Sequence, residues 1–309
     1  MLDINPVQHA FLKLWVGEKG GITAIGDPNQ AIYGFRGANK RFFQSFSDDF
    51  PGARRVTLRD NYRSGQTILA ASGQVMARDS DGAVPVLTAQ LYLEGKLTVF
   101  EAATDKAEAE YVVHQIEKLV GGTSMFSQDS GRVATESGAE RSFGDIAVLY
   151  RLKTQSRLLK QAFDRMGIPY HVVGENKNDE DGPEAVCPSR YEEFGVTAER
   201  VSLMTLHAAK GLEFPVVFIV GCEENLLPLN LVGLQAESRE ERRLFYVGMT
   251  RARERLYLLR ARKRLLFGQT LHPQASPFLK DFEAGLAEYE QAALKNKRRT
   301  PQDDQMSLF

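Results

Sequence analysis

The residues best suited to bind phosphate groups or bases lie in four short polar segments, and the first spans residues 26–38. Its Gln30 can donate a hydrogen bond to a phosphate oxygen or orient a water. Tyr33 and Phe35 alternate with a glycine and precede Arg36. Aromatic rings beside a cation form a stacking platform for unpaired bases, worth about 1–3 kcal/mol per base. The alternative is that both rings are core residues at a bend in the chain.

The second segment, residues 58–64, precedes a predicted helix. Ser64 is a suitable N-cap for that helix, because its hydroxyl can accept a hydrogen bond from a free backbone N–H group. Arg63 then stands at the helix start, where its forked guanidinium can reach a phosphate. Tyr62 can stack on a base. The alternative is a surface arginine beside a helix cap.

The third segment, residues 201–214, runs from an apolar strand into a polar turn that contains glycine. Thr205, His207 and Lys210 offer donors suited to phosphates. Glu213 offers an acceptor suited to a ribose hydroxyl. The alternative for the histidine is a structural role near the end of a strand.

The fourth segment, residues 240–253, has the apolar spacing of a packed helix, with Leu244 and Val247 on one buried stripe. Arg251 is expected to emerge near the C-terminal end of this helix. An arginine fixed by a packed helix can stabilise charge on a transferring γ-phosphoryl group. The alternative is a simple basic helix.

The pattern of apolar runs predicts the elements that position these segments. Continuous apolar runs predict strands at residues 22–25, 97–100, 146–150, 201–204, 216–220 and 256–259. Helical spacing predicts helices at residues 66–77, 108–120, 155–166, 238–252 and 277–294. Ser238 and Glu241 have the spacing of a capping box at the start of one of them. The alternation of strands and helices predicts a doubly wound α/β domain with a parallel sheet.

The chain of 309 residues has a net charge of −1, and 43% of its residues are hydrophobic. This balance excludes a wholly disordered chain and a uniformly basic nucleic-acid binder, but it allows a local basic surface. Residues 239–264 carry ten Lys or Arg against three Glu, which fits either an anionic ligand or a solvated helix face. Two cysteines, no apolar leader and no run of membrane length predict a soluble cytoplasmic protein.

Together and in this order, the four segments resemble motifs III, IV, V and VI of the UvrD/Rep/PcrA family of superfamily-one DNA helicases. Residues 144–174 also resemble the region between motifs IV and V, so the resemblance covers about residues 3–270. It implies a RecA-like α/β fold of the P-loop NTPase type, with a parallel sheet flanked by helices. It also implies a bacterial, nucleoid-associated protein that uses ATP and Mg²⁺ to move 3′-to-5′ along single-stranded DNA, as in DNA repair.

The resemblance implies roles for individual residues. Gln30, Arg63 and Arg251 resemble the catalytic residues that contact the γ-phosphate of ATP. Tyr62 resembles the residue that stacks on adenine, and Glu213 resembles the glutamate that contacts the ribose. The residues that resemble DNA contacts of the family are Tyr33, Phe35, Arg36, Thr205 and His207, with Phe35 where relatives often have Trp.

The sequence contains no Gly-x-x-x-x-Gly-Lys-Ser/Thr phosphate loop, and no Asp-Glu pair stands where the family holds Mg²⁺. We therefore expect the C-terminal half of a helicase, whose partner is the missing N-terminal RecA-like domain. Residues 1–45 are expected to be a remnant of that first domain, with motif III, and residues 46–270 the second RecA-like domain. A short acidic connector, residues 174–200, stands where relatives insert a helical accessory subdomain. Residues 271–309 are expected to form a helical and then flexible tail.

The last residues of the tail resemble the peptide that binds the bacterial sliding clamp, with Gln305, Met306, Leu308 and Phe309 as the matching positions. Leu308 and Phe309 are the expected anchors in a pocket of the clamp. The alternative is a tail that folds back onto its own domain. The leading hypothesis is a helicase fragment without ATP hydrolase activity of its own. The alternative function is a non-catalytic module, derived from a helicase, that binds DNA and a sliding clamp.

Overall fold

A computed structural model describes residues 3–17, 20–78, 86–91, 94–121, 141–174, 199–231 and 233–291. The terminal peptide with Gln305, Met306, Leu308 and Phe309 lies outside the described residues. Nearly all of the acidic connector, residues 174–200, lies outside them as well.

The centre of the protein is a seven-stranded sheet in which every pair of neighbouring strands is parallel. Its strands, in spatial order, are β13 (Glu288–Gln291), β3 (Lys96–Ala102), β10 (Ala252–Ala261), β7 (Phe214–Ile219), β4 (Ile146–Tyr150), β6 (Val201–Thr205) and β5 (Tyr170–Val172). In the register of the sheet, Leu256 of β10 lies between Leu97 of β3 and Val217 of β7. The central strands read as continuous apolar runs because both faces of the sheet are covered.

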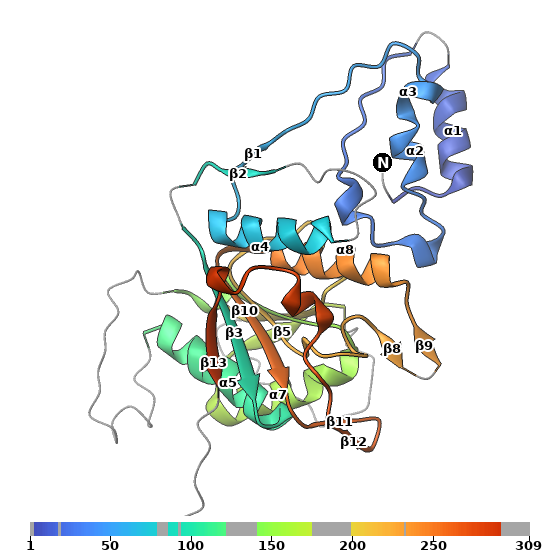
Figure 1. The fold of residues 1–309 in the computed structure, drawn as a ribbon. Helices are drawn as coiled ribbons and strands as arrows, with labels where there is room; N and C mark the ends of the chain where they lie inside the picture. The colour runs from blue at the N-terminus through green and yellow to red at the C-terminus, as the bar shows by residue number, and fades with distance from the viewer. Residues whose placement is uncertain are drawn as a thin grey trace, which may run out of the picture.

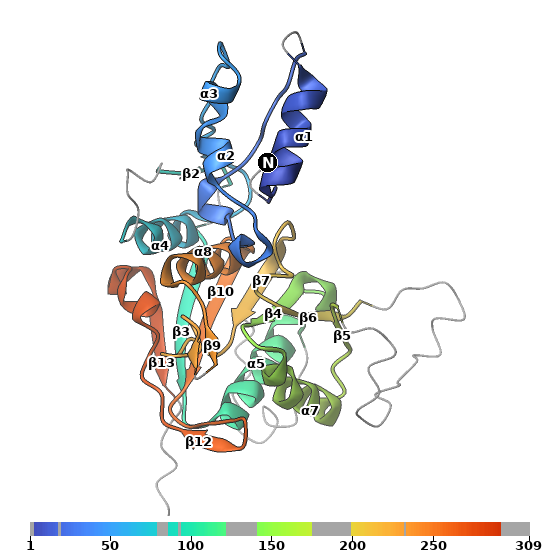
Figure 2. The same cartoon turned by 90° about the vertical axis from the view of Figure 1, so that its right-hand side faces the viewer.

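Described helices cover both faces of the sheet (Figures 1 and 2). Helices α4 (Gln66–Ala77) and α8 (Ser238–Met249) lie side by side over one face, and α5 (Asp105–Leu119) and α7 (Ser156–Met166) lie over the other. The predicted fold class is confirmed: the chain has a parallel sheet flanked by helices, which is the architecture of a RecA-like helicase core domain.

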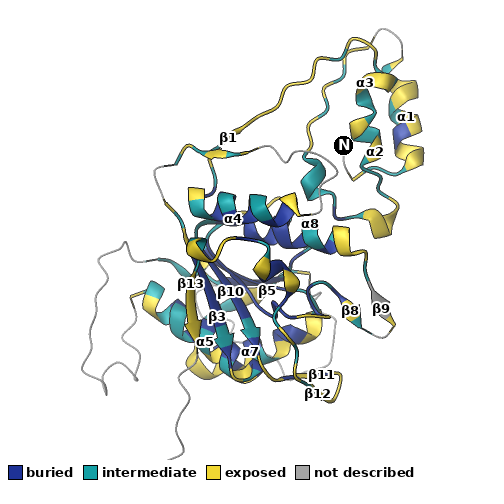
Figure 3. Cartoon of the chain, viewed as in Figure 1, coloured by how far each residue is buried: buried dark blue, intermediate teal, exposed yellow. Residues whose placement is uncertain are grey.

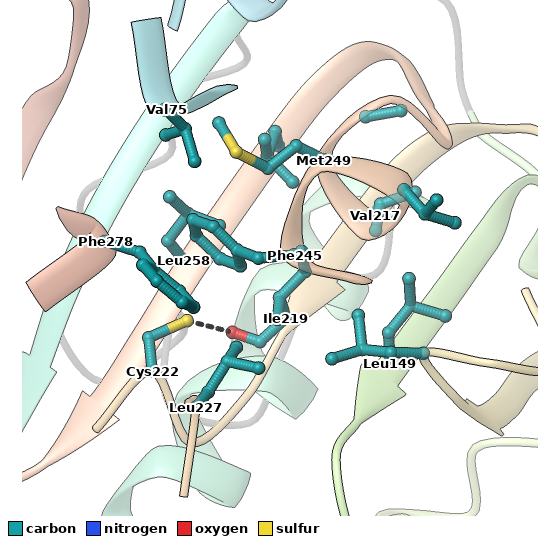
Figure 4. Close-up of a cluster of buried hydrophobic side chains, with 14 of the residues drawn as sticks. Val75, Leu149, Val217, Ile219, Cys222, Leu227, Phe245, Met249, Leu258 and Phe278 are labelled. Atoms are coloured by element: carbon teal, nitrogen blue, oxygen red, sulfur yellow. Dashed lines mark hydrogen bonds between the residues drawn. The ribbon is translucent and has the colours of Figure 1, made fainter. Parts of the chain in front are cut away.

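Each face of the sheet has its own hydrophobic core (Figure 3). The core under α4 and α8 includes Val75, Phe245 and Phe278. Figure 4 shows their side chains in one cluster with Cys222, whose thiol donates to the carbonyl of Ile219. The other core packs the apolar faces of α5 and α7 against alternate residues of the same strands. The two cores hold the sheet rigidly, so loops at its edges start from fixed positions.

A buried ionic cluster lies at the carboxyl edge of the sheet. Arg264 donates to Glu223 through Nε and Nη2, and its Nη2 also donates to Glu108 at 2.6 Å. Burial raises the pKa of Glu108, and the cluster compensates with the Arg264 charge and a hydrogen bond from the backbone of Gly221. The bonds fasten α5, β7 and the hairpin that follows β10 to one another.

Residues 3–50 form a unit outside the seven-stranded sheet, from which α1, α2 and α3 project, while the turn η1 packs against α8 (Figures 1 and 2). They comprise α1 (Pro6–Val16), two 3₁₀ turns η1 (Pro28–Gln30) and η2 (Gly34–Arg36), α2 (Arg41–Gln44) and α3 (Phe46–Asp49). Asn5 and Gln8 form a capping box at the start of α1. His9 and Lys13 of α1 contact the Asp49 carboxylate at 3.0 and 2.6 Å, which ties α1 to α3.

The remaining described elements are short. Three two-stranded pairs are β1 (Asp60–Asn61) with β2 (Thr88–Ala89), β8 (Asn230–Leu231) with β9 (Leu234–Gln235), and β11 (Arg264–Leu266) with β12 (Gln269–Leu271). The other 3₁₀ turns are η3 (Phe143–Asp145), η4 (Lys153–Gln155), η6 (Pro277–Lys280) and η7 (Ala284–Leu286).

The strand predicted at residues 22–25 is wrong, because this segment belongs to no sheet of the described structure. Its residues alternate between half-buried and exposed. A strand is stable only when its backbone groups pair with a neighbour, and this segment runs along the projecting N-terminal unit, away from the seven-stranded sheet (Figure 2). The apolar pattern alone does not supply that neighbour.

Two predicted helix caps are also wrong. The N-cap of α4 is Gly65, and the buried Ser64 hydroxyl instead donates to the Ala252 carbonyl at 2.6 Å. The N-cap of α8 is Glu237, and Ser238 is already inside the helix. Glu241, expected to complete a capping box, instead accepts hydrogen bonds from the Arg151 guanidinium and the Leu229 backbone. In each case a tertiary partner takes the side chain away from the helix end.

The helix predicted at residues 277–294 is wrong in the part that the structure describes. Residues 277–286 form the 3₁₀ turns η6 and η7, and β13 then adds to the edge of the sheet beside β3. Phe278, Leu279 and Phe282 are buried in the core under α4 and α8. Their spacing resembles that of a helix, but docking onto this core decides their conformation. Elsewhere the predicted helices and strands are present, with ends shifted by a few residues: α5 begins at Asp105 and α8 ends at Met249.

Candidate nucleotide and DNA-binding surface

The loop before α4 is held in place by its own side chains and by β10. Asn61 Oδ1 accepts the backbone N–H groups of Arg63 and Ser64, both at 2.9 Å. The Ser64 hydroxyl and the Gly65 N–H donate to the carbonyls of Ala252 and Arg253. The backbone of Arg63 is therefore fixed beside the start of β10. This strand begins directly after Arg251.

Arg63 and Glu213 form an ion pair across two separate segments. The Arg63 Nε donates to Glu213 Oε2 at 2.6 Å, and the two side chains are 34% and 44% exposed. This hydrogen bond lowers the pKa of the Glu213 carboxyl. Since the bond uses Nε and a third of the side chain is exposed, an anion can approach the Arg63 guanidinium from solvent.

Arg251 is buried, with 1% of its surface exposed, and does not emerge from the end of α8. Its guanidinium donates to the carbonyls of Val247 and Leu212 at 2.9 and 3.0 Å and to the Thr250 hydroxyl at 3.2 Å. Burial lowers the pKa of Arg251 to about 10, and the nearby Arg63 charge acts in the same direction, so the group stays protonated at neutral pH. A cation at the C-terminal end of a helix also interacts favourably with the free carbonyls there.

The loop with Gln30 faces the same end of α8. Asp27 accepts from the Asn29 backbone at 3.0 Å and from Gln30 Nε2 at 2.9 Å, which orients the Gln30 amide. The turn η1 packs against α8. Burial and the neighbouring Asp27 carboxylate raise the pKa of Tyr246 on α8. The Asp27 carboxylate of this loop therefore lies within electrostatic range of Arg251. Tyr62, which precedes Arg63 in the sequence, is 70% exposed.

Three rings form a second cluster at the carboxyl end of β6. Phe35 lies edge-on to His207 with ring centroids 5.6 Å apart, and Tyr33 lies 6.1 Å from Phe35. The Tyr33 hydroxyl donates to the His207 carbonyl at 3.3 Å. Phe35 is 66% exposed, so the cluster presents an open aromatic face.

Cations surround these rings. The Arg36 guanidinium carbon lies 5.4 Å from the centre of the Tyr33 ring, and the Lys210 ammonium lies 4.8 Å from it. Lys210 is held by Asp3 at 2.6 Å. Burial, followed by the charges of Arg151 and Arg36, lowers the pKa of His207 to about 4, so this ring is neutral at pH 7.

Thr205 shapes the turn that carries His207. Its Oγ1 accepts the Ala208 N–H at 3.2 Å, and the Tyr150 carbonyl accepts the Leu206 N–H. The hydroxyl thus holds the turn in the conformation that directs His207 towards Tyr33 and Phe35.

The structure brings the expected site residues into two neighbouring groups. Gln30, Arg63, Glu213 and Arg251 gather at the C-terminal end of α8, and Tyr33, Phe35, Arg36, Thr205 and His207 gather at the end of β6. Three supporting residues could not be identified from the sequence, because their partners are far away along the chain. They are Glu240, which accepts the Gly34 N–H, Arg243, which donates to the Ala31 carbonyl, and Tyr246, which lies near the Asp27 carboxylate. Asp27 supports Gln30 within the same short loop, so its role depends on local turn structure.

The residues present fit the phosphate and base of a nucleotide better than they fit a metal ion. The Arg63 guanidinium and the Gln30 amide offer donors for phosphate oxygens, and the buried Arg251 adds a fixed positive charge nearby. In the described parts of the chain, no three His, Cys, Asp or Glu side chains come together as a metal site would require. Nor does any described helix have both the length and the apolar character needed to cross a bilayer.

The model of the UvrD-like helicase C-terminal domain matches residues 56–178 and 188–263, which together make up more than half of the chain. The chain belongs to the UvrD-like helicase C-terminal domain family. The model of the UvrD/REP helicase N-terminal domain matches residues 2–51, which include the projecting unit with α1. The recognition of a UvrD/PcrA-type helicase from its motifs is confirmed.

Among its relatives are the ATP-dependent DNA helicases PcrA of Staphylococcus epidermidis and Staphylococcus aureus, both 26% identical to this chain. The matches cover 92% and 93% of this chain but 57% of each relative, so the chain spans just over half of their length. A crystal structure of the C-terminal domain of a possible DNA helicase from Lactobacillus plantarum WCFS1 shares 16% identity and a TM-score of 0.42, over 74% of this chain and 98% of that one.

Proposed function

We propose that this chain is the C-terminal half of an ATP-dependent 3′-to-5′ DNA helicase. It would supply two arginines to the γ-phosphate of ATP and part of the track for single-stranded DNA. The observation that carries this proposal is the meeting of Arg63, Glu213 and Arg251, from three separate segments, beside the loop that holds Gln30.

The two arginines have complementary tasks in this proposal. Arg251 is held by three hydrogen bonds and provides a fixed positive charge near the transferring phosphoryl group. Arg63 is more exposed and is released from Glu213 when a phosphate competes for its guanidinium. Glu213 then becomes available as an acceptor for a ribose hydroxyl, and the exposed Tyr62 ring can stack on adenine.

Gln30 links nucleotide to DNA. Its amide is oriented by Asp27, and it lies in the same short loop as Tyr33 and Phe35. A shift of Gln30 on contact with the γ-phosphate would therefore be passed along the backbone to the aromatic cluster. The neutral His207 and the cations Arg36 and Lys210 suit that cluster to stacked bases and backbone phosphates.

The phosphate loop and the Mg²⁺ ligands would come from a first RecA-like domain, either in the same polypeptide or in a separate one. We propose that this domain covers α1, which exposes Val7, Phe11, Leu14 and Trp15. A contiguous apolar helix face of this size is typical of an interface. Bound Mg²⁺ would neutralise charge on the phosphates.

The experiment is ATP hydrolysis by this chain, with and without single-stranded DNA, alone and mixed with a first RecA-like domain taken from a PcrA relative. The chain alone should be inactive, and the mixture should show turnover stimulated by DNA. In the mixture, Arg63→Gln should reduce the rate by about 10³-fold, as for other arginine fingers. Arg165→Gln, which removes an exposed arginine paired with Glu110 on the far face, should leave the rate unchanged.

Equal rates for the Arg63→Gln and Arg165→Gln proteins would contradict the proposed nucleotide site. DNA binding without turnover in the mixture would instead support the second function, a non-catalytic module that binds DNA and, through Leu308 and Phe309, a sliding clamp.

A further inference from the structure

A cavity of about 420 Å³ lies between the N-terminal unit and the start of α8. One wall is formed by residues 31–44 and the other by the first turns of α8. The side chains that carry charge into it are Lys40, Arg41, Glu237, Arg239, Glu240 and Arg243. Four cations against two carboxylates give the lining a net positive charge, which favours an anion.

Two of these charged groups build the cavity wall. Glu240 Oε1 accepts the Gly34 N–H at 3.0 Å, and the Arg243 Nε donates to the Ala31 carbonyl at 2.7 Å. A Cβ atom at Gly34 would lie only 2.7 Å from Glu240 Oε2, so the glycine permits this close approach. These bonds hold the 31–34 backbone against α8 and keep the cavity open beside it.

Lys40 and Arg41 line the facing wall. Within the described part of the chain, neither side chain forms an ion pair with a carboxylate. The Arg41 backbone N–H donates to Asn39 Oδ1, which fixes the start of α2 and so the positions of both residues. They are therefore positioned cations, ready for an anion from outside.

The cavity adjoins the aromatic cluster, because Tyr33 and Gly34 belong to its lining. We propose that it binds a backbone phosphate of the DNA strand whose bases stack on Tyr33 and Phe35, with Lys40 and Arg41 as the phosphate ligands. This inference rests on the proposed function, since it extends the same DNA track towards α8. The planar Arg41 guanidinium can donate directional hydrogen bonds to a phosphate, and the Lys40 ammonium can contribute a compact positive charge.

The test is the binding of a fluorescent oligothymidylate to the full chain, measured by anisotropy across a KCl titration. Lys40→Gln/Arg41→Gln should weaken binding by more than roughly tenfold, because it removes two charge-assisted hydrogen bonds, each worth about tenfold or more. It should also reduce the slope of log K against log salt by about 0.7 for each phosphate that the protein no longer neutralises. The matched control is Lys106→Gln/Arg157→Gln, which removes the same charge from exposed positions on α5 and α7 and should change neither quantity.

A stacking variant separates this inference from the proposed function. Phe35→Ala should weaken binding to oligothymidylate with little change in the salt slope, and should have no effect on an abasic oligonucleotide. Lys40→Gln/Arg41→Gln should weaken binding of both. If Phe35→Ala weakens binding and the double variant behaves as wild type, the phosphate site is wrong and the DNA track stands. If wild-type chain does not bind the oligonucleotide, the DNA track and the phosphate site both fail.

Discussion

Arg63 and Arg251 have the same side chain in opposite surroundings. Arg251 is nearly inaccessible and bonded by all three of its nitrogens, so its charge cannot move without breaking contacts to Val247, Leu212 and Thr250. Arg63 has one carboxylate partner and lies partly in solvent. A site that combines one immobile and one displaceable cation can sense whether a phosphate is present, because only one of the two must exchange partners.

At the residue scale, His207 should make stability depend on pH. Its pKa in the folded protein is about 4, below the ordinary value of 6.5, because it is partly buried and faces the charges of Arg151 and Arg36. The unfolded chain therefore binds a proton that the folded chain excludes, and the contribution of His207 is present above pH 6.5 and lost as the pH falls towards 4.

We expect His207→Gln to reduce this loss, as measured by urea unfolding at steps between these two pH values. Burial also lowers the pKa values of His114 and His171, so His114→Gln and His171→Gln should also reduce the loss, and the three variants compare the share of each histidine. A wild-type pH profile unchanged in the His207→Gln protein would show that the histidine is not buried against these cations.

At the element scale, the closeness of α8 to the sheet depends on Gly248. A Cβ atom there would lie 2.4 Å from Leu206 Cδ2 and 3.0 Å from Ile219 Cδ1. We expect Gly248→Ala to lower the free energy of unfolding by about 1–3 kcal/mol, because the helix must move away from a close-packed core.

The control is Gly73→Ala on α4, the helix that lies beside α8. No atom lies within 4 Å of the position of its Cβ, so the alanine should stabilise the protein by about 0.5–1 kcal/mol through helix propensity. Urea denaturation of both variants measures the two effects. A Gly248→Ala protein as stable as the Gly73→Ala protein would contradict the packing of α8.

Most of the sheet could be predicted because its strands are continuous apolar runs. The bounds predicted for strand β4 and for helix α4 are those that the structure gives them. The errors arise where a residue's partner is distant in sequence. Residues 22–25 have the composition of a strand, but they lie outside the sheet. The segment after Pro277 has helical spacing, but the core under α4 and the free edge of β3 determine its conformation.

The candidate site also has a part that could be predicted from the sequence and a part that could not. The motif residues could be identified from their order along the chain, which is a property of the sequence. The hydrogen bonds that support these residues could not be predicted. The Ser64 hydroxyl donates to the Ala252 carbonyl, and Glu240 accepts the Gly34 N–H, over sequence separations that no local pattern encodes. The burial of Arg251 also depends on the Leu212 carbonyl, which belongs to a different segment.

At the scale of the whole molecule, the final described strand protects the edge of the sheet. β13 pairs with β3, and the Tyr111 hydroxyl of α5 donates to Glu290 at 2.7 Å. We expect a protein ending at residue 287 to melt about 2–6 °C below one ending at residue 291, and to associate with itself, because the β3 edge becomes available to other strands.

Thermal melting and sedimentation of the two truncated proteins measure this difference. The protein ending at residue 291 serves as the control, since it keeps β13 and lacks only residues 292–309. Identical melting temperatures would mean that β13 does not contribute to the sheet.

The order of strands in the sheet also constrains synthesis on the ribosome. β3 is the first strand of this sheet to be made, yet both of its neighbours, β10 and β13, are made near the end of the described chain. While β4, β6 and β7 can assemble as they emerge, β3 must wait for β10 before it joins them. A nascent chain therefore carries an unpaired apolar strand from residue 102 until β10 is made from residue 252 onwards, a state in which premature association is a hazard.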